Sequence, residues 1–64
     1  MMAEYILKEI SCYRKSVKVE IKEFINEMEK DRWEYVKVIH ITTITRDVKG
    51  ERVSAKIEFK KKTE

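Results

Sequence analysis

Residues 33–46 read WEYVKVIHITTITR and hold the longest run of β-branched residues in the chain. Branching at Cβ stiffens the side chain and favours extended backbone. Apolar residues occur on both parities, with Val36 and Val38 on one and Tyr35, Ile39 and Ile41 on the other. A strand that is apolar on both faces is typical of the middle of a sheet, with a layer on each side. We therefore predict a strand over 33–46 in the middle of the sheet.

Strands are also predicted over 5–13 and 52–60. The first has apolar residues on both parities, whereas the last alternates cleanly, with polar residues between Val53, Ala55, Ile57 and Phe59. The only glycine, Gly50, lies between the last two strands, where a hairpin requires positive φ. We therefore expect residues 33–46 and 52–60 to form an antiparallel hairpin, and residues 61–64 to fray.

Residues 17–31 are predicted to form a helix. Val17, Val19 and Ile21 alternate like a strand, but over the longer window the apolar residues recur at i, i+4, i+7, i+8 and i+11. The longer periodicity decides for a helix, with Ser16 as its N-cap. The order is then β-α-β-β, in which a helical crossover of the length of a right-handed βαβ unit follows the first strand.

The fold class predicted is α+β: a single domain, residues 1–64, with a three-stranded sheet and one helix packed on one face. The residues expected under the helix are Val36, Val38, Val53, Ala55, Ile57 and Phe59. The opposite face would then carry Tyr5, Leu7, Trp33, Tyr35, Ile39 and Ile41. That is more apolar surface than a monomer leaves in water, so we predict a homo-oligomer whose interface includes Tyr5, Leu7, Tyr35, Ile39 and Ile41.

Length and composition point the same way. A domain of 64 residues is of marginal stability without a disulfide, a metal or oligomerisation. One cysteine, Cys12, and one histidine, His40, form neither an internal disulfide nor a four-ligand zinc site. No apolar run approaches the roughly 18 residues of a membrane span, so we expect a cytoplasmic protein that does not bind membranes.

Two families resemble this chain. The segments IKEFINEM (21–28), VKVIHITTIT (36–45) and VSAKIEF (53–59) resemble the small sporulation-associated βαββ proteins of spore-forming bacteria and their phages. The function of that family is not established, so the resemblance implies a fold. Carriage by phages suggests a specific hypothesis, sequestration of a signalling nucleotide.

The second resemblance is to the dodecins, which are βαββ flavin-binding proteins that assemble into dodecamers. DRWEYVKV (31–38) looks like the segment that carries their flavin-stacking tryptophan, which implies this role for Trp33. The Gly-Thr-Ser run after their first strand is replaced here by Cys12-Tyr13-Arg14, and the chain has no glutamine to pair with a flavin ring. We therefore expect no bound cofactor, and dodecin-like flavin storage is an alternative function.

Candidate ligand-binding residues share a chemistry suited to an aromatic or anionic molecule: an indole for stacking, and cations or hydroxyls for phosphate. They are Trp33, Arg14, Lys15, Thr43, Arg46 and Arg52. Arg14, Lys15 and Lys18 precede or begin the helix, where the macrodipole favours anions. The competing interpretations are a tryptophan that closes the helix–strand corner, and solvated turn residues.

No catalytic or metal-binding residue is predicted. His40 lies between Ile39 and Ile41 in a strand and lacks a nucleophile at a diagnostic spacing, so we interpret it as a sheet histidine. Cys12 is interpreted as a small buried hydrophobe. We therefore expect a protein that is not an enzyme.

The leading hypothesis is a non-catalytic oligomer that binds or sequesters a small anionic or aromatic ligand, such as a nucleotide, at a subunit interface. The alternative is a nucleic-acid-binding or protein-adaptor module that uses Arg52, Lys56 and Lys60 on the last strand. The net charge of +3 is modest and largely due to the lysines at 60–62.

Overall fold

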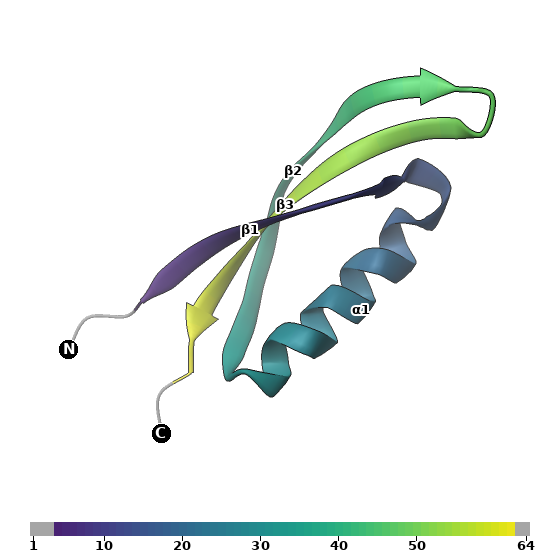
Figure 1. The fold of residues 1–64 in the computed structure, drawn as a ribbon. Coiled ribbons are helices and arrows are strands. Elements are labelled where there is room, and N and C mark those ends of the chain that lie inside the picture. The colour runs from purple at the N-terminus through teal and green to yellow at the C-terminus, as the bar shows by residue number, and fades with distance from the viewer. Residues whose placement is uncertain (1–3, 63–64) are drawn as a thin grey trace.

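The last strand of the chain, rather than the β-branched one, lies in the middle of the sheet (Figure 1). The computed structural model describes residues 4–62. Its elements are β1 (Tyr5–Tyr13), a 3₁₀ turn η1 (Arg14–Ser16), α1 (Val17–Lys30), β2 (Trp33–Asp47) and β3 (Gly50–Lys61). The strand order is β1-β3-β2. The α+β class and the β-α-β-β order are confirmed, but the prediction of a central strand at 33–46 is wrong.

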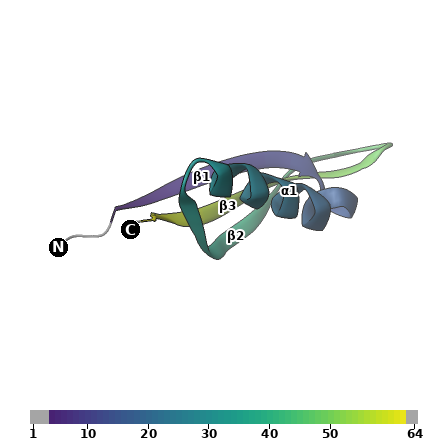
Figure 2. The same cartoon turned by 90° about the horizontal axis from the view of Figure 1, so that it is seen from below.

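Both outer strands pair antiparallel with β3, so β1 and β2 run parallel to each other without being neighbours. The crossover through α1 therefore leaves a gap of one strand, and β3 fills it after the hairpin turn. A central strand has neighbours on both edges, and β3 also has α1 over one face (Figures 1 and 2). Accordingly its helix-side residues Val53, Ala55, Ile57 and Phe59 are completely buried.

The helix packs its apolar stripe on this row. Val17 and Met28 are buried, and Ile21, Phe24 and Ile25 pack against the core from the same element. The Phe24 ring meets the Phe59 ring edge-on, with centroids 5.8 Å apart. Of the three residues that alternate like a strand, Val17 and Ile21 face the core and only Val19 is exposed. The segment therefore follows the helical periodicity.

Ser16 occupies the N-cap position of α1, but its hydroxyl caps nothing. Its Oγ donates to the carbonyl oxygen of Tyr13 at 3.2 Å, which closes the turn η1 instead. This turn was not predicted. It carries Arg14 from the end of β1 toward the β2–β3 hairpin.

β2 is longer than the strand it pairs with because it contains three register shifts of the kind that β-bulges produce. Its 15 residues face the 12 residues of β3. The shifts fall between Tyr35 and Lys37, between Val38 and His40, and between Thr43 and Thr45, so the unpaired residues are Val36, Ile39 and Ile44. Each bulge adds one residue to β2. The side chains after the bulge therefore lie on the face opposite to the one that strict alternation predicts.

The bulges correct the predicted face assignment. Tyr35 pairs with Phe59, Val38 with Ile57 and Ile41 with Ala55, and residues opposite each other in a sheet share a face. Trp33, Tyr35 and Ile41 therefore lie on the helix side and not, as predicted, on the other. Val36 was expected under the helix, but it is a bulge residue that remains 39% exposed.

The outer face of the sheet, away from α1, is mostly polar. Tyr5 and Leu7 lie there as predicted, opposite Lys60 and Glu58, and both are exposed. The residues on β2 that share this face by register are Glu34, Lys37, His40, Thr42 and Thr45. The large apolar outer face expected from the sequence is therefore not present among the described residues.

The connections use the residues that their geometry needs. Gly50 has φ +133° after the tight turn, as predicted, and the Lys49 N–H donates to Asp47 Oδ1 at 2.9 Å. Arg32 adopts φ +67° between α1 and β2, and its carbonyl accepts from the N–H of Lys62 at 2.8 Å. Lys61 also donates to the carbonyl of Glu4, so β3 extends one residue past its predicted end, while residues 63–64 of the tail expected to fray lie outside the described part. Within residues 4–62, no helix has the length and apolarity needed to cross a membrane.

Candidate functional site

The structure separates the predicted ligand-binding residues into three places. Arg14, Thr43 and Arg46 meet on the helix side of the sheet near the hairpin turn. Arg52 lies on the outer face, and Trp33 lies at the opposite end of β2. Lys15 is exposed on η1. One chain by itself therefore does not gather the six residues into a single site.

Glu51 organises the first of these places, which we call the Glu51 cluster: Arg14, Thr43, Arg46 and Glu51. Arg14 Nε donates to Glu51 Oε1 at 2.7 Å, and Arg46 Nε donates to Glu51 Oε2 at 3.2 Å. The Thr43 hydroxyl donates to Glu51 Oε2 at 2.8 Å and accepts from Arg14 Nη2 at 3.2 Å. These contacts join η1, β2 and β3.

The cluster carries two guanidinium groups and one carboxylate, so its formal charge is one positive unit. Hydrogen bonds from Thr43, Arg14 and Arg46 lower the pKa of Glu51 to about 2, because they favour the charged carboxylate. An anion at this place therefore shares the two arginines with Glu51. Sequence analysis missed Glu51, although its position opposite Arg46 across a four-residue hairpin turn follows once the register is known.

Arg52 has partners on the outer face of the sheet. Its guanidinium lies 5.0 Å from the centroid of the Tyr13 ring, and its Nη2 is 3.4 Å from Ser11 Oγ. Tyr13 faces Arg52 directly in the β1–β3 register. The same cation–aromatic pairing recurs on the helix side at the other end of the sheet, where Lys61 Nζ lies 5.1 Å from the centroid of the Trp33 ring.

Trp33 packs where α1 ends and β2 begins. It contacts the core cluster formed by Met28, Ile57 and Phe59, and it is half-buried. This is the corner-closing position that competed with a stacking role. The rest of the ring remains accessible next to the Lys61 ammonium, so the site offers an aromatic surface and a cation together.

The basic row on β3 is interleaved with acids from its neighbours. Arg52, Lys56 and Lys60 share the outer face, as predicted from alternation. By register, Glu9 faces Lys56 and Glu34 faces Lys60. Opposite charges on facing positions reduce the net field of this face.

A row of apolar side chains follows β2, which is an edge strand. Five large hydrophobic residues are between 38% and 52% exposed: Tyr35, Val36, Ile39, Ile41 and Ile44. Among residues 4–62, the edge of β2 that faces away from β3 pairs with no strand. We call these five residues the β2 row. Tyr35, Ile39 and Ile41 were predicted as interface residues, whereas Tyr5 and Leu7 lie on β1 at the other edge of the sheet.

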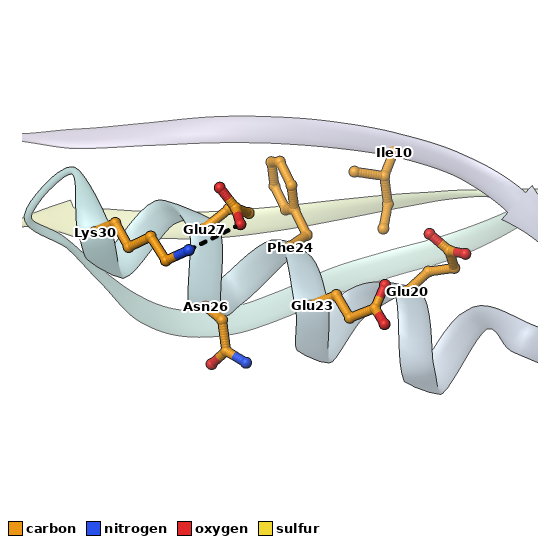
Figure 3. A pocket seen from close by; sticks show the side chains of 7 residues that line it. All are labelled: Ile10, Glu20, Glu23, Phe24, Asn26, Glu27 and Lys30. Carbon is orange, nitrogen blue, oxygen red and sulfur yellow. Dashed lines mark hydrogen bonds and ion pairs between the residues drawn. The ribbon is translucent and has the colours of Figure 1, made fainter.

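An open groove of about 640 Å³ lies between α1 and β1 (Figure 3). Phe24 and Ile10 form its apolar part, and its polar lining is Glu20, Glu23, Asn26, Glu27 and Lys30. Lys30 Nζ is 3.3 Å from Glu27 Oε2, and the other two carboxylates add negative charge. The groove contains none of the predicted ligand-binding residues, and its charge is unsuited to an anion.

The residues capable of chemistry are dispersed. His40 is exposed on the outer face opposite Lys56. Cys12 is buried beside Val17, Val53 and Ala55, and desolvation raises the pKa of its thiol, which confirms its interpretation as a buried hydrophobe. No group of three potential metal ligands occurs within residues 4–62. Comparison with family models, curated proteins and solved structures finds no match for this chain.

Proposed function

We propose that this protein is a non-catalytic binding protein that works as an assembly of identical chains joined through β2. Its ligand is a small anionic or aromatic molecule, such as a nucleotide, held where two chains meet. The observation that carries the proposal is the β2 row, because it combines exposed apolar side chains with an unpaired strand edge.

The β2 row favours a partner for two physical reasons. An edge strand presents backbone N–H and C=O groups that can pair with another strand. Soluble monomers shield such edges with charges, short strands or β-bulges. β2 has three bulges, but it is 15 residues long, and Lys37 is the only charged side chain between Glu34 and Arg46. Large apolar side chains at the same edge add a hydrophobic contribution to any such pairing.

The ligand class rests on the two cationic places on the helix side. Trp33 with Lys61 provides an aromatic surface and a positive charge, and the Glu51 cluster provides two arginines and a hydroxyl. Both places lie at the ends of β2, so an assembly through β2 puts them at or near subunit boundaries. Neither place offers a nucleophile with an adjacent base, in keeping with binding rather than catalysis.

Native mass spectrometry and sedimentation velocity test the assembly. The expected result is a dimer or larger oligomer of the wild-type chain, which Ile41→Glu converts to monomers because it buries an unpaired charge in the interface. Leu7→Glu is the matched control, since Leu7 is an exposed apolar residue on β1. A wild-type monomer at tens of micromolar overturns the proposal, as does an assembly that Leu7→Glu dissociates and Ile41→Glu does not.

A second candidate function is nucleic-acid binding by the outer face. The specific observation in its favour is that Tyr5 and Tyr13 share this face with Arg52, Lys56 and Lys60. Aromatic rings beside cations suit single-stranded nucleic acid. The test is titration with a labelled single-stranded oligonucleotide at two salt concentrations. Binding that weakens steeply with salt and with Arg52→Ala supports this function, and salt-independent or absent binding rejects it.

A further inference from the structure

We propose that two β2 strands pair antiparallel about Val38, and that each ligand site combines Trp33 of one chain with the Glu51 cluster of the other. This inference rests on the proposed function, since it specifies how the chains meet and where the ligand lies. It starts from the register of β2, whose bulges decide which residues share a face.

A continuous antiparallel sheet requires that residues facing each other across the new interface lie on the same side. The helix-side residues of β2 are Trp33, Tyr35, Val38, Ile41, Thr43 and Arg46, because their β3 partners are all on the helix side. When two copies pair about Val38, Trp33 faces Thr43, Tyr35 faces Ile41, and Val38 faces its own copy. All of these are helix-side residues, and on the outer face Glu34 meets Thr42.

Other centres fit less well. Pairing about Ile39 or His40 puts Val38 opposite His40 or Thr42, which lie on the outer face. A centre at Lys37 places two lysines against each other, and like charges on facing positions are unfavourable.

Two further centres conflict with the pattern of apolar residues. A centre at Ile41 places Tyr35 opposite Asp47, which lies on the outer face, and a centre at Thr42 places Val38 opposite Arg46. Only the centre at Val38 pairs Tyr35 with Ile41, the two exposed apolar residues that point to the helix side.

In the resulting dimer the two chains form one six-stranded sheet with both helices on the same side. The apolar stripe made by Tyr35, Val38 and Ile41 of both chains then forms a floor between the two helices. At each end of this floor, Trp33 of one chain lies opposite Thr43 of the other. Thr43 is hydrogen-bonded to Arg14 and Glu51 of its own chain. The dimer thereby brings the start of β2 in one chain next to the end of β2 in the other. The two-fold symmetry repeats this contact, which gives two equivalent sites.

The spacing of the composite site suits a mononucleotide. Arg46 lies three residues beyond Thr43 along the strand, which is about 10 Å at the rise of a β-strand. A base can therefore contact Trp33 while its phosphate reaches the guanidinium of Arg46, whose side chain is mostly exposed. Lys61 beside the indole adds a second cation.

Cross-linking tests the register. In a Cys12→Ala background, Val38→Cys places two thiols at the two-fold axis, where facing Cβ atoms lie about 4.5–5.5 Å apart. Oxidation with diamide is expected to convert the dimer of this variant to a disulfide-linked form faster than the dimer of Ile44→Cys. Faster linkage through Ile41→Cys than through Val38→Cys shifts the axis and overturns the inference, even if the protein is a dimer.

Complementation between two defective chains tests the shared site. Trp33→Ala and Arg46→Ala each remove one half of every site, so neither homodimer is expected to bind adenosine monophosphate in equilibrium dialysis. A heterodimer of the two contains one intact site, formed by Trp33 of one chain and Arg46 of the other. Mixing and equilibrating the two variants should restore about a quarter of the wild-type sites at random exchange.

The outcomes separate the two proposals. A monomeric wild-type chain removes the proposed function and the inference together. The wild-type dimer can bind adenosine monophosphate while the mixed variants regain no binding. That result contradicts the shared site but not the proposed assembly. A wild-type dimer that binds neither adenosine monophosphate nor inorganic phosphate removes the ligand class, and with it the shared site.

Discussion

The two strands of the β2–β3 hairpin are neighbours and pair along their whole length, yet they differ in almost every physical respect. β3 is regular, with four consecutive helix-side residues completely buried. β2 has three bulges and no buried residue. The difference follows from position: a central strand is held on both edges and covered by α1, whereas an edge strand is held on one.

Alternation in sequence is a reliable guide to the face of a residue only where the strand is regular. In β3 the period of two holds from Val53 to Phe59, and each apolar residue is where alternation places it. In β2 the bulges make Tyr35, Val38 and Ile41 share a face at a spacing of three. The two apolar parities of β2 therefore do not mean that both of its faces are buried.

Deletion of single residues should give the largest difference in stability between changes in β2 and changes in β3. Deleting Val36 removes a bulge residue and leaves every β2–β3 pair in place, so the variant is expected to fold and to melt cooperatively. Deleting Lys56 turns half of β3 inside out and moves buried residues to the outer face. It should abolish the whole stability of the domain, about 5–15 kcal/mol for a typical small protein.

Thermal unfolding followed by circular dichroism distinguishes these outcomes. A cooperative transition for the Lys56 deletion contradicts the central role of β3. Loss of the transition in the Val36 deletion contradicts the interpretation of Val36 as an extra residue. Deletion of Ile44, another bulge residue, is the matched control for the effect of shortening β2.

Truncation of facing aromatic residues should show the same contrast on a smaller scale. Phe59 is fully buried on β3, and its ring meets that of Tyr35 at 6.5 Å between centroids. Phe59→Ala is expected to lower the free energy of unfolding by about 3–5 kcal/mol because it leaves a cavity under α1. At a protein concentration low enough to give single chains, Tyr35→Ala, at a residue 40% exposed in one chain, should lower it by about 1 kcal/mol.

Urea denaturation of the two single variants and the double variant gives both values and their coupling. A coupling of about 0.5–1.5 kcal/mol is expected for an edge-to-face aromatic pair. Equal losses in the two single variants at that concentration would contradict the contrast, because one chain by itself leaves Tyr35 partly exposed. At higher protein concentration, where the proposed dimer forms, the loss for Tyr35→Ala should grow, because a second chain then covers this side chain.

Much of the fold follows from local patterns in the sequence. The bounds of β1 and the start of α1 match their predicted positions, and the hairpin glycine has the predicted positive φ. The strand order does not follow, because propensity measures how readily a segment becomes a strand and not how many neighbours it has. β2 has the stronger propensity, but β3 has the regular row of apolar residues that α1 can cover.

The candidate site was less predictable than the fold. Arg14, Thr43 and Arg46 were selected by residue type, and the structure brings these three together. Glu51, which joins them, was not among the predicted residues, because its contacts span up to 37 residues and depend on the strand order. Arg52 was selected for the same chemistry, but alternation places its side chain on the other face of the sheet.

The smallest expected effect on stability concerns the hydrogen bonds of Glu51, which connect β2 to β3 near the hairpin turn. The pKa of the Glu51 carboxyl lies near 2 in the folded chain, below its ordinary value of 4.5. A carboxyl group whose pKa is lower in the folded state than in the unfolded state stabilises the fold fully at pH values above its unfolded-state pKa. This contribution is lost as the pH falls toward and through its folded-state pKa. Glu51→Gln should therefore lower stability at pH 7, with a difference from wild type that shrinks between pH 4.5 and about 2.

Urea midpoints measured across this pH range test the prediction, with Glu29→Gln on the exposed face of α1 as a control for the loss of one negative charge. If the difference between wild type and Glu51→Gln is the same at pH 7 and pH 2, ionisation of Glu51 does not carry the effect. If it shrinks as expected, the Glu51 cluster is a polar fastening between β2 and β3 that depends on charge. A phosphate-bearing ligand would then meet two arginines that are already held in place by a carboxylate.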